Sequence, residues 1–146
     1  MNAAPSKRPT VPFHEHTQIE FFDVPPGHGR IRAPAIRELT NHLGTVHGGM
    51  LFAIGEIAAA NGMVRMLGAD IQKVRAITRR GSIEYLKPAR GAITGDAQVS
   101  MTTAQIMAAL ETEPSINVPI AVSLTDEAGV EVATLAIEWF VGRPKG

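Results

Sequence analysis

Between Met50 and Leu67 the chain reads M-L-F-A-I-G-E-I-A-A-A-N-G-M-V-R-M-L, an almost wholly apolar run of good helix formers without proline. This run predicts a helix from about Gly49 to Leu67, with Gly68 as its C-cap. Apolar residues occupy every face of the helix rather than one stripe, so we expect a sheet to wrap around it. Glu56 is the one carboxylate inside the run, where a hydrocarbon side chain would be expected.

Segments rich in β-branched and aromatic residues flank this helix and predict strands. They lie at Thr17–Val24 and Gly29–Ala35 before the helix, and at Val74–Leu86, Ala92–Thr102, Val118–Thr125 and Val130–Val141 after it. A short surface helix is predicted at Thr103–Glu113. This order of elements predicts a single α+β domain over residues 17–146, with a curled antiparallel sheet around one long central helix. Residues 1–16 are expected to be a flexible N-terminal tail.

The composition narrows the possible classes of function. The 146 residues are 45% hydrophobic and carry a formal net charge of +0, which is typical of a soluble globular domain and makes nucleic acid and anionic membranes poor partners. No cysteine is present, so disulfides, thiolate nucleophiles and thiolate zinc sites are excluded. The longest apolar stretch falls short of the about 20 residues that a membrane span needs. We therefore expect a cytoplasmic protein.

The start of the helix is the first part of a candidate active site. From Asn41 to Glu56 the sequence is N-H-L-G-T-V-H-G-G-M-L-F-A-I-G-E. The N–H groups of Gly48 and Gly49 belong to the first turn, where they have no intrahelical partner, and glycine allows a ligand oxygen to approach closely. Such donors suit a thioester or ester carbonyl oxygen that gains negative charge on attack. His47 and Asn41 lie beside this point and can orient substrate or water.

Glu56 is the second part of the candidate site, but it lies about 10 Å along the helix axis from Gly49. One helix cannot apply both groups to the same carbonyl. A two-fold dimer with adjacent antiparallel helices would bring Glu56 of each chain to the helix start of the other. The spacing thus favours an active site shared between subunits. A purely structural alternative is that Glu56 pairs with a partner across a subunit interface.

Other catalytic motifs are absent from the sequence. The histidines His14, His16 and His28 have no acids or cysteines nearby at ligand spacing, so no metal site is predicted. The chain contains no G-x-S-x-G, P-loop or G-x-G-x-x-G pattern. Serine-elbow hydrolysis and nucleotide chemistry are therefore not indicated.

These residues resemble those of hotdog-fold thioesterases, in particular the PaaI-like and 4-hydroxybenzoyl-CoA thioesterase group. The resemblance covers roughly Phe21 to Arg143. It depends on Asn41, then His47-Gly48-Gly49, then an acid nine residues after the histidine, here Glu56. The segment Tyr85–Gly91, Y-L-K-P-A-R-G, is similar to the strand ending Y-x-x-P-x-x-G of that family.

The resemblance implies a hotdog subunit that forms a homodimer, often paired into tetramers, and that hydrolyses acyl-CoA thioesters. No metal or separate cofactor is implied, since coenzyme A is part of the substrate. Gly48, with Gly49 next to it, would supply the oxyanion N–H. Glu56 would act as general base or nucleophile, and Asn41 would position water or the substrate carbonyl. His47 would contribute to substrate binding.

The resemblance also implies roles beyond the central helix. A family hydroxyl on the following strand falls on Thr78. Surface cations that bind CoA phosphates in the family have candidates here in Arg79, Arg80, Lys87 and Arg90, of which Arg80 and Arg90 are the assignments we make. The alternative for each of these residues is that it is a solvent-exposed cation at the end of a strand, with no role in binding.

One position departs from the family pattern. Gly81 lies in the middle of a strand, where it either opens room for an acyl chain beside the helix or marks a bulge. Strict alternation along the strand places Arg79 on the same face as Gly81, where it would suit a polar acyl group.

Two rival functions stay open at this point. A 3-hydroxyacyl dehydratase of the same fold uses a histidine fourteen residues before a helical glutamate, a spacing that His42 and Glu56 share. The surrounding H-F-P-G pattern of that class is missing, however. The second rival is a non-catalytic acyl-CoA-binding module, because binding and catalysis would use the same pocket.

Overall fold

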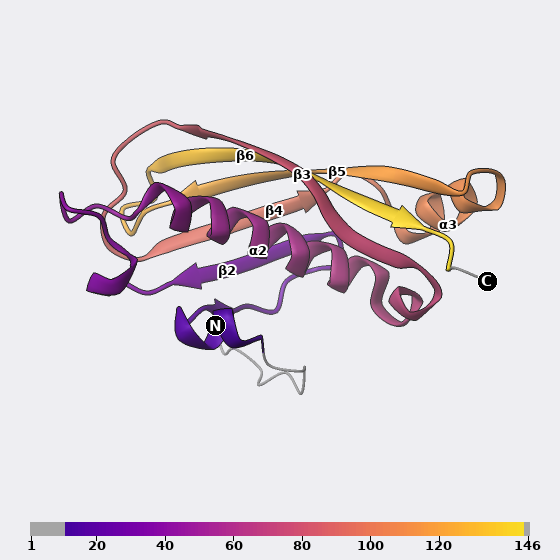
Figure 1. The fold of residues 1–146 in the computed structure, drawn as a ribbon, viewed down its shortest axis with the longest axis horizontal. Helices are drawn as coiled ribbons and strands as arrows, with labels where there is room; N and C mark the ends of the chain where they lie inside the picture. Colours follow the sequence, from indigo (N-terminus) through magenta and orange to yellow (C-terminus); the bar gives the residue numbers. More distant parts are fainter. Residues whose placement is uncertain (1–10, 145–146) are drawn as a thin grey trace.

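The computed structural model describes residues 11–144, which form one curled sheet with a long helix lying along it (Figure 1). The helical elements are α1 (Pro12–His16), η1 (Arg37–Leu39), α2 (Gly48–Leu67), η2 (Gly68–Lys73) and α3 (Thr103–Thr112). The strands are β1 (Glu20–Phe21), β2 (His28–Ala33), β3 (Arg75–Tyr85), β4 (Ile93–Val99), β5 (Ser115–Thr125) and β6 (Glu131–Gly142).

The six strands form one antiparallel sheet in the order β1-β2-β4-β5-β6-β3. The strand after the long helix, β3, therefore lies at one edge of the sheet, and the short β1 lies at the other. The predicted antiparallel sheet with one central helix is confirmed. The segment 86–92 does not make a hairpin, because β3 and β4 lie on opposite sides of the β5-β6 pair.

Helix α2 is buried on most sides, as its apolar composition predicts. Two glycines bring the sheet close to it: a Cβ on Gly29 of β2 would lie 2.6 Å from the backbone nitrogen of Gly62, and a Cβ on Gly55 would lie 2.4 Å from Leu135 of β6. The segment Gly48–Lys73 is long and apolar enough to cross a membrane by composition alone. However, 61% of its most apolar window is buried inside the fold, so it serves as a core helix.

The first strand, β1, is shorter than the strand predicted at Thr17–Val24. Only Glu20–Phe21 pairs with β2, because the N–H of Thr17 bonds to the Phe13 carbonyl at 3.0 Å and Gln18 has a positive φ of 56°. Within the predicted N-terminal tail, Pro12–His16 form the helical turn α1, and residues 1–10 of that tail lie outside the described part of the chain.

Candidate active site

The first turn of α2 leaves one of the two predicted glycine donors free. His47 is the N-cap, and its Nδ1 accepts the N–H of Gly49 at 2.9 Å. The N–H of His47 itself donates to the Leu39 carbonyl at 2.9 Å. Among the described residues, no hydrogen bond uses the N–H of Gly48. Gly48 is therefore the donor that can meet a substrate oxygen, and His47 keeps its Nε2 side for a ligand.

The side chain of Asn41 closes the loop that leads into the helix. Its Oδ1 accepts the N–H groups of Leu43 at 2.9 Å and Thr45 at 3.2 Å, and its Nδ2 donates to Thr45 Oγ1 at 2.8 Å. Thr45 is buried, so this network fixes the loop from inside. One Nδ2 hydrogen of Asn41 is left for any further partner.

Tyr85, the last residue of β3, holds the helix start from the sheet side. Its hydroxyl donates to the Gly48 carbonyl at 3.0 Å. Four residues later, the carbonyl of Ala89 accepts the N–H of Val46 at 2.8 Å. The segment that suggested the family resemblance thus supports the start of α2. The sequence indicated this segment only through its similarity to the family and did not predict the contact between Tyr85 and Gly48.

The fold brings together Glu56 and Thr78, which the sequence related only through the family resemblance. The Oγ1 of Thr78 donates to Glu56 Oε1 at 2.7 Å. The Glu56 side chain is half-buried, and no cation of the described residues lies within ion-pair distance of it. Its carboxylate therefore keeps a free oxygen that can accept a proton or attack a substrate.

A β-bulge at Arg79 explains how one strand supports both parts of the site. Thr78 and Tyr85 are seven residues apart, an odd number that strict alternation would place on opposite faces. On β6 their partners Trp139 and Ala133 are six residues apart, because the ladder shifts between Thr78 and Arg80. The extra residue turns both side chains toward α2. It also corrects the predicted placement of Arg79, which leaves the ladder and lies on the opposite face from Gly81.

Gly81 does not open room for an acyl chain within one subunit. A Cβ at this position would lie 2.8 Å from Phe52 Cζ and 2.8 Å from Ile137 Cδ1. The aromatic ring of Phe52 on α2 thus occupies the space that the sequence suggested for substrate. Gly81 is required for this close contact between the strand and the helix.

The N-terminal turn α1 adds a second ionisable group near Glu56. The His14 ring lies 5.3 Å from the ring of Phe21 and is half-buried. Burial lowers the pKa of His14 from its ordinary value of 6.5, and the negative charge of Glu56 acts in the opposite direction. In the sequence, the spacing of His14 bears only on metal binding, which it does not support. No motif relates it to Glu56, since the two residues meet only in the folded chain.

The two cations assigned to substrate binding lie outside the central helix region. Arg80 is exposed on β3, with its Nη1 3.8 Å from Oε2 of Glu138 on β6. Arg90 is exposed in the segment between β3 and β4. Neither forms an ion pair with Glu56. In residues 11–144 there is no group of three or more His, Cys, Asp or Glu side chains that could hold a metal ion.

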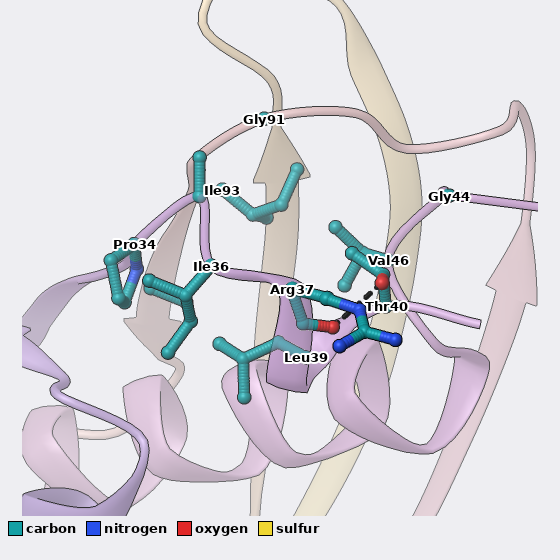
Figure 2. A pocket seen from close by; sticks show the side chains of 11 residues that line it. Pro34, Ile36, Arg37, Leu39, Thr40, Gly44, Val46, Gly91 and Ile93 are labelled. Atoms are coloured by element: carbon teal, nitrogen blue, oxygen red, sulfur yellow. Dashed lines mark hydrogen bonds between the residues drawn. The ribbon is translucent and has the colours of Figure 1, made fainter.

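A cavity of about 210 Å³ lies behind the loop that precedes α2 (Figure 2). Its walls are mostly apolar, with Leu39, Val46 and Ile93 among them, and the Arg37 side chain lies across it. A larger, shallower depression of about 670 Å³ lies against β2, β4, β5 and β6. Neither cavity is lined by Gly48 or Glu56. The two candidate catalytic groups also remain two turns apart on one helix, so a single chain does not bring them together.

The chain matches a family model described as "Domain of unknown function (DUF4442)" over residues 7–141. The chain belongs to the DUF4442 family. No curated protein sequence matches it. Among solved structures, it resembles a Pseudomonas aeruginosa protein of unknown function described as a probable thioesterase, with 22% identity, coverage of 92% of this chain and 89% of that chain, and a TM-score of 0.77.

Two further solved structures support the same fold. A thioesterase family protein from Silicibacter pomeroyi is 15% identical, with coverage of 92% and 91% and a TM-score of 0.74. The Escherichia coli PaaI protein from the phenylacetic acid degradation operon is 17% identical, with coverage of 92% and 85% and a TM-score of 0.69. The predicted hotdog fold is thereby confirmed.

Proposed function

We propose that this DUF4442 protein is an acyl-CoA thioesterase, active as a homodimer in which each site uses groups from both chains. The observation that carries the proposal is the arrangement of strand β3. One end of the strand holds Glu56 through Thr78, and the other end holds Gly48 through Tyr85. The two candidate catalytic groups are thus attached to opposite ends of a single edge strand.

The free edge of β3 supports the dimer. Among the described residues this strand of 11 residues pairs only with β6, so its other edge has no strand partner. Long unpaired edges are normally covered or paired in natural proteins. Antiparallel pairing of two β3 strands about a two-fold axis would bring the Thr78 end of one chain to the Tyr85 end of the other. Glu56 would then lie near Gly48 of the other chain.

The proposed reaction uses these groups directly. The thioester carbonyl oxygen accepts the N–H of Gly48, where the helix dipole favours developing negative charge. Glu56 either removes a proton from the attacking water or attacks the carbonyl carbon itself. The carbon–sulfur bond then breaks, and coenzyme A leaves as the thiol after gaining a proton. Products are the free acid and CoA.

Thiol release from a panel of acetyl-, hexanoyl-, lauroyl- and phenylacetyl-CoA tests this function. The protein contains no cysteine, so a thiol reagent reports only released CoA. We expect hydrolysis of at least one thioester, reduced by 10²- to 10⁴-fold in Glu56→Gln. Dehydration of 3-hydroxyacyl-CoA without thiol release would favour the His42 and Glu56 dehydratase instead. Tight CoA-ester binding without turnover would favour a binding module.

Mixed dimers test whether the site is shared. Glu56→Gln and Gly48→Pro chains, each inactive alone, are refolded together in equal amounts. Half of the dimers are then mixed, and each mixed dimer holds one intact site, so recovery of about a quarter of wild-type activity is expected. A chain carrying both substitutions, mixed with either single variant, is the matched control and should recover nothing. No recovery in the first mixture, with dimers present by light scattering, would contradict the shared site.

The role of Glu56 as base or nucleophile is settled by a single turnover in H₂¹⁸O. If water attacks the thioester, the acid product carries ¹⁸O after the first turnover. If Glu56 attacks first and water then opens the resulting anhydride at the Glu56 carbonyl, the label enters the protein carboxylate, so label in Glu56 after one turnover identifies the nucleophilic route. Mass spectrometry of the peptide that contains Glu56 distinguishes the two outcomes.

A further inference from the structure

The cavity of about 210 Å³ beside η1 has no part in the proposed reaction, and it is called the η1 cavity below. It lies where the end of β2 and the start of β4 meet the loop that precedes α2 (Figure 2). In the sheet, β5 and β6 separate these two strands from β3. The η1 cavity is therefore remote from the edge strand that contacts Gly48 and Glu56.

The size and the walls of the η1 cavity suit a small apolar group. Its walls include Ile36, Leu39, Val46 and Ile93. Leu39, Val46 and Ile93 belong to the buried core, so packing holds this side of the cavity in place. In another protein, an apolar cavity of about 150 Å³ binds benzene. By that comparison, the η1 cavity has room for a group of about six carbon atoms.

Arg37 brings a positive charge to this apolar cavity. Its side chain lies across the cavity in Figure 2. Among residues 11–144, the guanidinium of Arg37 takes part in no ion pair and no hydrogen bond. A guanidinium binds a carboxylate through two parallel N–H donors. A free guanidinium next to apolar walls therefore fits a carboxylate that carries a short apolar tail.

One acid approaches the η1 cavity, but its charge is already offset. A Cβ on Gly91, which lines the cavity, would lie 3.2 Å from Cδ of Glu127. The Glu127 carboxylate accepts a backbone N–H at 3.3 Å and lies 3.7 Å from Nη2 of Arg32. Arg37 is thus the cavity charge that keeps no partner, and the cavity favours an anion over a cation.

The η1 cavity is connected to the start of α2. Leu39 lines the cavity, and its carbonyl accepts the N–H of His47 at 2.9 Å. Val46, another wall residue, forms a β-bridge with Thr40 and directly precedes His47, the N-cap of α2. A ligand that packs against Leu39 and Val46 therefore contacts the loop that positions this N-cap.

We propose that the η1 cavity binds a free monocarboxylic acid with an apolar tail of about six carbons. The tail lies against Leu39, Val46 and Ile93, and the carboxylate binds Arg37. This site goes beyond the proposed thioesterase function and does not depend on it, because none of these residues takes part in that reaction. An acyl-CoA is not the expected ligand, because its thioester has no carboxylate for Arg37.

A methyl NMR titration with sodium hexanoate tests the site directly. We expect the methyl resonances of Leu39, Val46 and Ile93 and the amide resonance of His47 to shift with a single Kd. From acetate to hexanoate, Kd should fall about fourfold for each added CH₂ group. Decanoate should bind no more tightly than hexanoate, since its tail exceeds the cavity. Wall methyl resonances that do not move at millimolar hexanoate would overturn the proposal.

Hexanol and Arg37→Gln together test the role of the charge. Hexanol has the same chain without the carboxylate, so it should bind the wild type about tenfold more weakly than hexanoate. In Arg37→Gln this difference should disappear, whereas Arg37→Lys should keep most of it. Lys73→Gln, which removes an exposed charge from η2, is the matched control and should keep the full difference. An equal preference for hexanoate in the wild type and in Arg37→Gln would overturn the proposal.

Hexanoyl-CoA distinguishes a free acid from the acyl group of a substrate. The Glu56→Gln variant is used, so that the thioester persists during the measurement. We expect hexanoyl-CoA to leave the hexanoate-bound resonances of the wall methyl groups unchanged. Displacement of hexanoate by hexanoyl-CoA would overturn the proposal and assign the cavity to the substrate. A wild-type chain that binds hexanoate as expected, but hydrolyses no thioester, would support the η1 site and overturn only the thioesterase function.

Discussion

The two ends of strand β3 support the same helix in different ways. At the Tyr85 end, the helix start is shaped mostly by its own neighbours in sequence, with His47 capping Gly49 and Asn41 closing the loop. At the Thr78 end, Glu56 is held by a residue 22 positions away, and its negative charge acts on another, His14, from the N-terminal turn. The position of the Gly48 donor is therefore set by local structure, whereas the environment of Glu56 is set by contacts between distant segments of the fold.

The bulge at Arg79 is what lets one strand serve both ends. Without it, either Thr78 or Tyr85 would face away from α2, since seven residues separate them. The same extra residue also turns Arg79 out to the opposite face, where it lies beside Phe140. A local irregularity of the strand thus connects the contacts of Glu56 and Gly48 with the position of Arg79.

Deletion of Arg79 should therefore have the largest effect. Removing the extra residue forces regular alternation, so Thr78 and Tyr85 can no longer both reach α2. We expect thioester hydrolysis to fall by about 10³-fold or more, as for the combined loss of an oxyanion donor and a positioned base.

The control for this deletion is Arg79→Gly, which keeps the residue count and the bulge but lacks the guanidinium. This variant should keep kcat close to that of the wild type. Circular dichroism checks that the deletion variant folds. A folded deletion variant with near wild-type kcat would show that the bulge does not set the two contacts.

Gly48→Pro should have the next largest effect, confined to the Tyr85 end. Gly48 is the first residue of α2, a position that accepts proline without breaking the helix, but the substitution removes the free N–H. Loss of one oxyanion donor predicts a decrease in kcat of about 10²- to 10³-fold.

Gly48→Ala separates the donor from the added bulk at the same position. Alanine keeps the N–H, and its Cβ would lie 3.3 Å from the Tyr85 hydroxyl, which is a tight contact. We expect it to retain most of the activity. Equal losses in the proline and alanine variants would mean that crowding, rather than the missing donor, is responsible.

Most of the fold could be predicted from the sequence because its signals are local. The apolar run from Met50 to Leu67 predicts a helix buried on most sides, and Gly68 ends it with the φ of 53° that glycine accepts readily. The later strands were predicted from their alternation and turns. The first strand was predicted too long, because the bonds of Thr17 to α1 and the positive φ of Gln18 leave no signal in a propensity pattern.

The candidate site was predictable in its residues but not in its contacts. Thr78 and Tyr85 could be named because their segments resemble a known family. Strict alternation, however, wrongly placed Arg79 on the same face as Gly81, because the position of a β-bulge cannot be predicted from one sequence. His14 could not be predicted at all, since its proximity to Glu56 depends on α1 folding back toward the central helix. Contacts between distant segments need the sheet register, which only the folded chain provides.

Thr78→Val should have a moderate effect at the acid end. The substitution keeps the shape of the side chain but removes the hydroxyl that donates to Glu56 at 2.7 Å. A hydrogen bond to a charged group contributes about 1.5–3 kcal/mol, so we expect kcat/KM to fall about tenfold. Thr78→Ser retains the donor and should stay close to wild type. If the valine and serine variants were equally active, the bond to Glu56 would have no part in turnover.

His14 offers the smallest and most specific test of the acid end, through the pH dependence of stability. Burial lowers the pKa of His14 below 6.5, with Glu56 partly opposing this. The unfolded chain therefore binds more protons than the folded chain just below pH 6.5, so the free energy of unfolding should fall as pH drops through this range, and this contribution should level off below the folded pKa.

His14→Gln should remove this contribution, so that the stability difference from wild type changes between about pH 7 and 5. His16→Gln, an exposed histidine on the same turn, is the control and should keep the wild-type slope. In Glu56→Gln, the opposing negative charge is lost, and NMR titration should show the His14 pKa lower than in wild type. An unchanged His14 pKa in that variant would mean that α1 does not bring the imidazole close enough to sense the carboxylate. The acid would then be supported from the Thr78 side alone.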